Sequence, residues 1–205
     1  MLNKPRGVIT ACRDDKNETV MSCLPQEWKH LRPVGRLDKE TEGLLLFTDD
    51  GKFTQQLLSP ASNIAKTYAF ICFGTLTEDG IRELESGTTL YANHRPAKPC
   101  EVLLQRHLTV GEVGQYISAR RREHHLNNPG GAASQGVIRI TEGQKHEVRL
   151  LMRTVHCAVL YLKRLSIGAL VLDESLSPGE GRLLTEEEIK LLLQSPPPLW
   201  EMNNE

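Results

Sequence analysis

The chain has 205 residues, of which 39% are hydrophobic and 25% are charged, and its formal net charge is -1. This composition fits one large domain or two small lobes, and it excludes global disorder and a strongly basic protein. The sequence begins with polar residues and has no apolar segment of the roughly 20 residues that a membrane span needs, so we expect a cytoplasmic protein with no membrane partner.

Short apolar segments predict the elements in the first half of the chain. Residues 44–47 form an apolar run that predicts a strand, and residues 52–58 predict a brief helix that the Ser-Pro pair at 59–60 ends. Alternating side chains at 67–73 predict a strand that is buried on both faces. Residues 81–87 then predict a second short helix.

A long segment without periodicity separates the next two strands. The strands are predicted at 102–104 and 137–141, and residues 105–135 between them read as a basic, flexible insertion. Its basic residues include Arg120, Arg121 and Arg122. The insertion also contains the turn sequence Asn-Asn-Pro-Gly-Gly, which is typical of a hairpin.

Two helices are predicted in the last third of the chain. Residues 145–157 place His146, Arg149, Arg153 and His156 on one face, with apolar residues opposite. Such a basic face is usually only solvated, although it also suits phosphate contacts. A Thr-Glu-Glu-Glu capping box at 185–188 starts a Leu-rich structural helix. The mixed periodicities together favour an α+β fold with mainly antiparallel strands.

The segment most indicative of function is 35–48, which reads GRLDKETEGLLLFT. Asp38 lies between Arg36 and Lys39, and a carboxylate beside cations is held ionised and can act as a nucleophile or base. An ordinary solvated salt bridge on a loop explains the same residues. Composition alone leaves both interpretations open.

The sequence offers no pattern for a metal or a nucleotide cofactor. Its five cysteines contain no C-x-x-C pair, and its seven histidines contain no H-x-x-x-H pair. It also has no Gly-rich loop of the P-loop or dinucleotide type. We therefore expect neither a metal nor a cofactor.

Four ordered motifs resemble those of one enzyme family. They are LNKPRG at 2–7, GRLDKETEGLLLFTDDG at 35–51, KTY at 66–68 and EGQKHEVR at 142–149. Together they resemble the ribosomal-type pseudouridine synthases, which isomerise uridine in RNA. Residues 176–189 are similar to the end of the branch that modifies small-subunit ribosomal RNA.

The resemblance implies a fold and a set of site residues. The fold is the pseudouridine synthase fold, a curved, mainly antiparallel sheet with flanking helices and two α+β lobes around a catalytic cleft, spanning residues 1–205. Asp38 matches the catalytic aspartate, Tyr68 the tyrosine that stacks on the target base, and Arg149 the basic partner of the aspartate. The residues that we expect to contact RNA are Arg36, Lys4, Lys66, His146, Arg153, Arg120, Arg121 and Arg122.

The sequence departs from the family pattern in several places. Leu150 and Gln144 replace residues that are commonly basic, and Glu147 replaces a common glutamine. The sequence starts at the opening motif, so we expect no small N-terminal S4 RNA-binding domain. Our hypothesis is that the insertion at 105–135 takes over part of the RNA positioning.

Several alternatives to a small-subunit target remain. The same chemistry could act on large-subunit ribosomal RNA or transfer RNA, or the chain could be a non-catalytic RNA-binding or ribosome-assembly factor. A glycoside hydrolase would instead pair Asp38 with Glu40 or Glu42. We expect a monomer whose partner is RNA, either as free RNA or within a pre-ribosomal particle.

Overall fold

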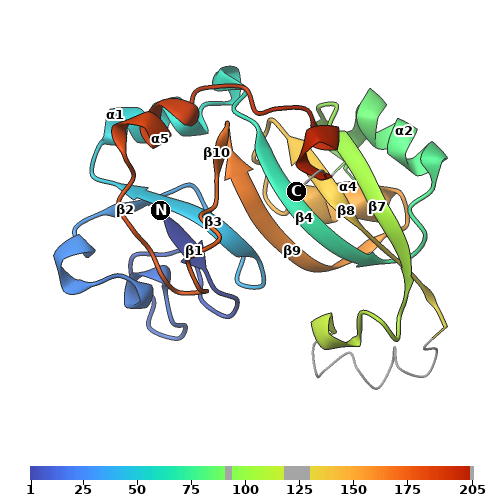
Figure 1. Ribbon diagram of the computed structural model, residues 1–205, viewed down its shortest axis with the longest axis horizontal. Helices are drawn as coiled ribbons and strands as arrows, with labels where there is room; N and C mark the ends of the chain where they lie inside the picture. The colour runs from blue at the N-terminus through green and yellow to red at the C-terminus, as the bar shows by residue number, and fades with distance from the viewer. Residues whose placement is uncertain (91–93, 118–129, 204–205) are drawn as a thin grey trace. The chain divides into compact units, whose positions relative to one another are not determined.

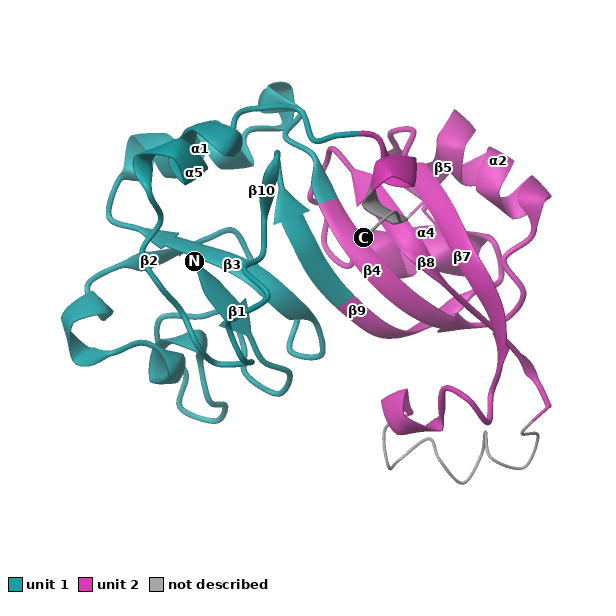
Figure 2. Ribbon diagram, viewed as in Figure 1, with its two compact units in different colours: residues 1–66, 163–197 teal, residues 67–162, 198–205 magenta. Residues whose placement is uncertain are grey.

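A computed structural model describes residues 1–90, 94–117 and 130–203 of the chain. The chain forms two compact units, coloured separately in Figure 2. Unit 1 contains Met1–Lys66 and Lys163–Pro197, and unit 2 contains Thr67–Leu162 and Pro198–Glu205. The chain passes from one unit to the other within strands β4 and β9, and between two prolines near its end.

Unit 1 is built around the buried strand β3. Its strands are β1 (Leu2–Lys4), β2 (Arg32–Val34), β3 (Glu42–Thr48), the later part of β9 (Ala158–Ile167) and β10 (Leu170–Val171) (Figure 1). Its helices are η1 (Val20–Cys23), η2 (Gln26–Trp28), α1 (Gly51–Leu58), η3 (Pro60–Ser62) and α5 (Glu186–Leu191). Strands β1 and β2 pair with β3 antiparallel, whereas β3 and β9 pair in parallel.

Local capping explains where the helices of unit 1 begin. The Asp50 carboxylate accepts the N–H groups of Lys52 and Phe53 at the start of α1, at 2.8 and 3.0 Å. Thr185 and Glu188 form the predicted capping box at the start of α5. The sequence therefore located both helices correctly, because their start signals are local.

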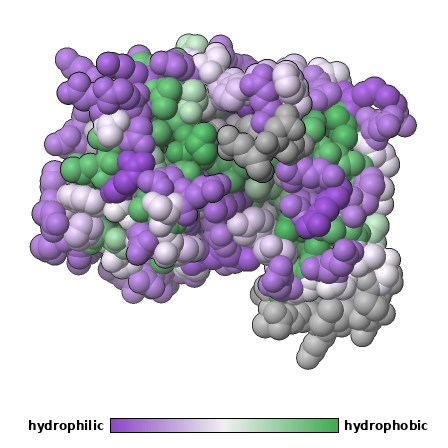
Figure 3. All heavy atoms as spheres, viewed as in Figure 1, coloured by the Kyte–Doolittle hydropathy of each residue, from purple (hydrophilic) through white to green (hydrophobic). Residues whose placement is uncertain are grey.

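The core of unit 1 lies between β3 and the segments that cover it. Its buried members are Met1, Val34, Leu44, Leu46, Leu57, Ile64, Ile167, Leu170, Leu172 and Leu192. They come from both parts of the chain that form the unit, so residues after 163 complete a core that the first 66 residues begin. Hydrophobic residues also show between hydrophilic ones on the face in Figure 3, as is normal for protein surfaces.

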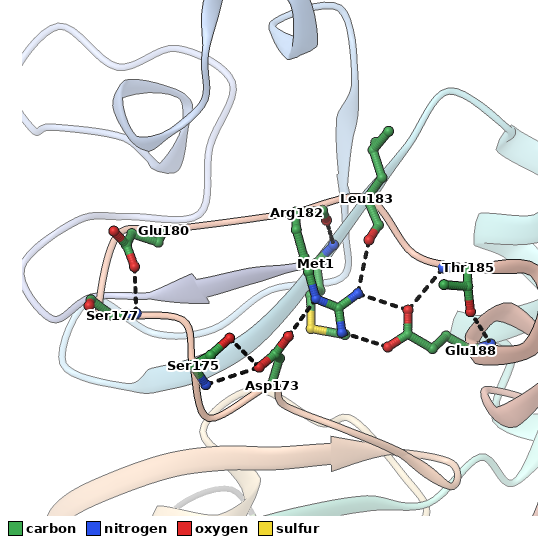
Figure 4. A network of polar contacts seen from close by, with 9 residues as sticks. All are labelled: Met1, Asp173, Ser175, Ser177, Glu180, Arg182, Leu183, Thr185 and Glu188. Atoms are coloured by element: carbon green, nitrogen blue, oxygen red, sulfur yellow. Dashed lines mark hydrogen bonds and ion pairs between the residues drawn. The ribbon is translucent and has the colours of Figure 1, made fainter.

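A polar network ties the C-terminal part of unit 1 to β1 (Figure 4). We call residues 173–188 the C-terminal strap. The guanidinium of Arg182 donates to Asp173 and forms two hydrogen bonds with Glu188, at 2.8 and 2.6 Å. The strap lies against β1, since the Asn3 N–H donates to the Glu180 carbonyl at 2.9 Å and the Asn3 side chain donates to the Leu176 carbonyl at 2.7 Å. Strand β1 is thus held by β3 and by the strap.

Unit 2 is a sheet with helices. Its strands are β4 (Lys66–Phe73), β5 (Thr88–Thr89), β6 (Pro96–Ala97), β7 (Glu101–Thr109), β8 (Ala132–Ile140) and the earlier part of β9. Its helices are α2 (Glu78–Ser86), η4 (Gly114–Tyr116), α4 (Glu147–Thr154) and η5 (Leu199–Asn203). The strand order is β9-β4-β8-β7, and β5 pairs with β6 separately. The combination of strands and helices confirms the predicted α+β class.

The hairpin of β7 and β8 contains much of the predicted insertion. Both strands are longer than expected, so residues 105–109 and 132–135 belong to the antiparallel pair of β7 and β8. The register of this pair shifts between Leu104 and Arg106. Beyond β7, Val110, Val113 and Ile117 are buried in a small core of unit 2. The next residues, 118–129, include Arg120, Arg121 and Arg122 and lie outside the described part of the chain. Their role in RNA binding stays a prediction.

Candidate active site

Asp38 lies in the connection between β2 and β3, residues 35–41, which we call the Asp38 loop. Its side chain is half-buried, and its carbonyl oxygen accepts the Thr41 N–H at 3.0 Å to close a turn. The preceding residue, Leu37, is buried and anchors the loop. The hydroxyl of Thr10 donates to the Leu37 carbonyl at 2.8 Å and accepts the Leu37 N–H at 3.1 Å. The backbone that presents Asp38 is therefore fixed on both sides.

Lys4 lies beneath the same loop. Its side chain is fully buried, at 0% exposure, and its ammonium donates to the carbonyl oxygens of Pro5 at 2.9 Å, Thr41 at 2.9 Å and Lys39 at 3.5 Å. Burial lowers the pKa of Lys4 from 10.5 to about 8, against the opposing effect of nearby groups that include Cys23 and Asp38. The Lys4 donors are thus directed to acceptors inside the protein, and the predicted contact of Lys4 with RNA stays a prediction.

The other charged residues around Asp38 have their own contacts. Arg6 forms an ion pair with Glu40 at 3.1 Å, and the Lys39 ammonium donates to the Asn17 side chain at 2.9 Å. Arg36 is exposed, as a residue that contacts RNA must be. The Asp38 loop thus combines a half-buried carboxylate with cations at the surface, and it is tied to the segment between Lys4 and Asn17.

Strand β4 positions the predicted stacking residue in unit 2. Tyr68 is 7% exposed and follows Thr67, which is fully buried. The Thr67 hydroxyl accepts a hydrogen bond from Arg139 at 3.2 Å, and the buried Arg139 guanidinium also pairs with Glu101 at 2.9 Å. These contacts fix the start of β4 in unit 2. Lys66, the first residue of the strand, is half-buried and donates to the Ile64 carbonyl at 3.0 Å within unit 1.

Helix α4 of unit 2 presents the predicted arginine. Arg149 is half-buried, and one guanidinium nitrogen donates to the Val159 carbonyl at 3.3 Å. Arg153 is exposed on the same helix, whereas Val148, Leu151 and Met152 face the core as predicted. The two faces of the helix therefore differ in the way that the sequence indicated.

The predicted helix at 145–157 is longer than the observed one. Helix α4 begins at Glu147 and ends at Thr154, and His146 and His156 have left-handed backbone conformations, with φ of 58° and 59°. Both histidines therefore lie beyond the helix, and both are exposed. The periodicity alone could not indicate these ends, because the left-handed residues interrupt the helical backbone without interrupting the pattern.

Two of the unusual motif residues are used inside unit 2. The buried carboxylate of Glu147 accepts the Gln144 N–H at 2.7 Å. The Gln144 side chain donates to the Pro96 carbonyl at 3.0 Å and to Glu142 at 3.2 Å. These residues therefore brace the turn before α4.

The described residues were compared with the requirements of a metal site and of a membrane span. Among them, no group of histidine, cysteine and acidic side chains could hold a metal ion, and no helix has the length and apolarity for crossing a bilayer. Cys72, Cys100 and Cys157 are buried free thiols. Of the residues that the sequence predicts to be catalytic, Asp38 lies in unit 1, and Tyr68 and Arg149 lie in unit 2.

Sequence reasoning missed the residues that support these groups. No motif or periodicity in the sequence indicated the roles of Thr10 and Arg139 or the burial of Lys4. Thr10 lies 27 positions before Leu37, and Arg139 lies 72 positions after Thr67. Only the fold brings such pairs together.

Comparison with known proteins assigns a family to this arrangement. Residues 1–154 match the profile described as RNA pseudouridylate synthase. The uncharacterized RNA pseudouridine synthase YtzG of Bacillus subtilis is 37% identical over 194 residues, which cover 94% of this chain and 72% of that protein. Ribosomal small subunit pseudouridine synthase A of Escherichia coli is 34% identical over 191 residues, covering 92% and 71%.

A solved structure shows the same fold. A crystal structure of pseudouridylate synthase matches with a TM-score of 0.74 and 29% sequence identity, and the match covers 93% of this chain and 71% of that one. The match confirms the fold that the four sequence motifs implied.

Proposed function

This chain belongs to the RNA pseudouridylate synthase family, and we propose that it isomerises one uridine of small-subunit ribosomal RNA to pseudouridine. The small-subunit target is supported by the similar protein from Escherichia coli, which is named ribosomal small subunit pseudouridine synthase A. The main structural support for catalysis is the fixed Asp38 loop, in which Thr10 and Lys4 hold the backbone on both sides of a half-buried carboxylate. A ribosomal target also fits a cytoplasmic location.

The proposed reaction rearranges bonds within one nucleotide. The bond between N1 of uracil and C1′ of ribose breaks, the retained base rotates, and C5 forms a new bond to C1′. C5 then loses its proton and N1 gains one, so no redox change and no external group is involved. An ionised carboxylate, a platform for the base and exclusion of water are sufficient for such a step.

Three residues have proposed roles in this reaction. Asp38 is the catalytic carboxylate, whether it attacks C6 of the base, attacks C1′ or acts as a base, because each role needs the same ionised group. Tyr68 stacks on the target base and helps to remove the C5 proton. Arg149 keeps the aspartate ionised by its positive charge.

The target uridine must leave its stack before these residues can reach it. We propose that Arg36 braces the flipped-out nucleotide, since a planar guanidinium can stack on bases and bind phosphate. His146 and Arg153 are exposed and suit phosphate contacts. Lys66 is half-buried, and we assign it a contact with RNA near the start of β4.

The decisive test is pseudouridine mapping in ribosomal RNA from cells that lack this gene. The cells are complemented with the wild type, with Asp38→Asn or with Glu40→Gln as the matched control. We expect one small-subunit site to disappear and to return with the wild type and the control but not with Asp38→Asn. The control is suitable because Glu40 is exposed and paired with Arg6.

Other outcomes lead to different conclusions. A lost site in large-subunit or transfer RNA would keep the chemistry and change the target. Full complementation by Asp38→Asn would refute the catalytic assignment. If the wild-type protein bound RNA but altered no uridine, the result would favour a non-catalytic assembly factor.

A further inference from the structure

Strands β5 and β6 form a short antiparallel pair apart from the main sheet of unit 2. Leu90, which follows β5, and Ala97 of β6 are both buried. The N–H of Leu90 donates to the Arg95 carbonyl at 2.8 Å, which links the two sides of the pair. We call the described residues 88–90 and 94–98 the β5–β6 segment. Its backbone is held by strand pairing and by two apolar anchors.

The β5–β6 segment is tied to the turn before α4, residues 142–146. The Lys98 N–H donates to the Glu142 carboxylate at 3.1 Å. The Gln144 side chain donates to the same carboxylate at 3.2 Å and to the Pro96 carbonyl at 3.0 Å. Gln144 therefore has one partner in its own turn and another in the β5–β6 segment. Two parts of the sequence that lie 44 to 48 positions apart thus form one local structure.

These contacts bring three cations to one part of unit 2. Arg95 directly precedes Pro96. Lys145 directly follows Gln144, whose side chain binds Pro96. Lys98 lies two positions after Pro96, and the side chains of all three cations are exposed. We call Arg95, Lys98 and Lys145 the basic surface of unit 2.

The charge and polarity of this region fit a polyanion better than a protein. In the β5–β6 segment and the turn, three cations stand against the single carboxylate of Glu142. A protein interface needs an apolar centre, and the exposed large hydrophobic side chains of the described chain lie in unit 1 and at Trp200. RNA carries a negative charge on each phosphate, and arginine and lysine bind phosphate through charge-assisted hydrogen bonds.

We propose that the basic surface of unit 2 binds phosphate groups of the RNA substrate, and that Gln144 positions this surface by holding the β5–β6 segment. The proposal rests on the proposed function for the identity of the RNA, and on the contacts within unit 2 for the placement of the cations. It extends the predicted contact of His146, which directly follows Lys145, to a second part of the chain. Phosphate contacts orient RNA but carry no sequence information, so this surface holds the RNA without selecting the uridine.

The first test measures RNA binding at several salt concentrations for Arg95→Gln, Lys98→Gln, Lys145→Gln and the triple variant. Arg82→Gln is the matched control, because Arg82 is an exposed arginine of unit 2 whose ion pairs lie within its own helix. Each single variant should bind small-subunit ribosomal RNA roughly three- to tenfold more weakly at about 100 mM salt. The slope of log K against log salt concentration should decrease in magnitude by about one in each, and by about two to three in the triple variant.

Turnover and sequence preference test whether the surface only holds the RNA. In the triple variant, KM should rise while kcat stays within about twofold of the wild type. An RNA of the same length and unrelated sequence should lose as much affinity, because both RNAs have the same phosphates. An unchanged salt slope in the triple variant would refute the proposal, as would an equal loss of affinity in Arg82→Gln. Normal binding of free RNA, with activity reduced only on small-subunit particles, would reject it in favour of a ribosomal protein.

The second test determines whether Gln144 acts through the cations. Gln144→Met keeps the approximate size of the side chain but removes its amide donors, so the Pro96 carbonyl loses this hydrogen bond. We expect RNA binding to weaken by roughly threefold in the wild-type background and to show no further loss in the triple variant. An equal loss in both backgrounds would overturn the positioning role of Gln144. Urea denaturation checks that every variant is folded.

The two sets of measurements separate the basic surface from the proposed reaction. If the wild type altered no uridine but the triple variant still had a smaller salt slope, the proposed function would fail and the basic surface would remain. If the wild type modified its uridine and the triple variant bound RNA as tightly at every salt concentration, the proposed function would stand and the basic surface would be refuted.

Discussion

The hydroxyl of Thr10 forms two hydrogen bonds with the backbone of Leu37, the residue directly before Asp38. One side chain thus satisfies both the N–H and the carbonyl of Leu37, as a neighbouring strand would. This contact fixes the N-terminal side of the Asp38 loop, and Lys4 fixes the C-terminal side. The backbone that carries the Asp38 carboxylate is therefore held on both sides by residues of the first ten positions.

Replacing Thr10 with valine should disturb both stability and turnover. Thr10→Val keeps the shape but leaves two polar groups of Leu37 without this partner, so we expect a loss of about 1 to 3 kcal/mol in the free energy of unfolding. Urea denaturation measures this loss, and kcat should fall because Asp38 is held less firmly. Thr10→Ser retains the hydroxyl and should restore most of both. A defect in Thr10→Ser as large as that in Thr10→Val would contradict this account, because the hydroxyl alone would then not hold the loop.

Tyr68 should separate stacking from proton transfer. Tyr68→Phe keeps the ring, so RNA affinity should stay within about twofold while kcat falls on the order of 100-fold or more, because the hydroxyl can no longer help to remove the C5 proton. Tyr68→Leu should weaken RNA binding as well, since it removes the stacking face. The measurements are single-turnover rates and equilibrium binding to the mapped RNA. A fully active Tyr68→Phe would restrict Tyr68 to the role of a platform.

Gly43 allows β3 to approach β9 closely. Its φ is +100°, and an added Cβ would lie 2.2 Å from the carbonyl oxygen of Arg164. Gly43→Ala should therefore cost about 3 to 5 kcal/mol of unfolding free energy through backbone strain and a clash with main-chain atoms. Gly51→Ala is the matched control, because a Cβ there meets nothing within 4 Å. Thermal denaturation that gave the two variants equal stability would contradict this account of the strand contact.

The contribution of Arg182 should depend on pH. Its hydrogen bonds lower the pKa of Glu188 from 4.5 to about 2, so this part of the stability is complete above the ordinary glutamate pKa and is lost as the pH falls towards 2. Arg182→Gln should be less stable than the wild type in urea at neutral pH, and the difference should shrink as the pH falls towards 2. Arg82→Gln removes an exposed ion pair of α2 and should have little effect at either pH. A difference that grew in acid would reject this interpretation.

Much of the organisation could be predicted where the signals are local. The capping box at Thr185 and the Asp50 turn located α5 and α1, and the apolar run at 44–47 located β3. The placement of Asp38 in an ordered loop before a buried strand also followed from residues 35–48. In each case, the residues that determine the structure lie within about one turn or strand of each other.

Other features were missed because distant residues determine them. Strand β9 was not predicted, since Arg164 and Ser166 occupy buried positions where an alternating strand would have apolar residues. The Arg164 side chain instead donates to the Leu44 carbonyl at 2.7 Å, 120 positions earlier. Lys4 was predicted only as a contact with RNA, and its partners at 39 and 41 became apparent only in the fold.

The contacts of the C-terminal strap also affect when, during synthesis of the chain, the support of the Asp38 loop is completed. Asn3 bonds to Leu176, 173 positions later, and β1 together with the strap supports Lys4 beneath Asp38. Because synthesis proceeds from the N-terminus, this support is completed only after residues up to Glu180 have emerged. A nascent chain that ends before residue 176 therefore lacks these contacts of β1, so the support of the Asp38 loop is among the last parts of unit 1 to be completed.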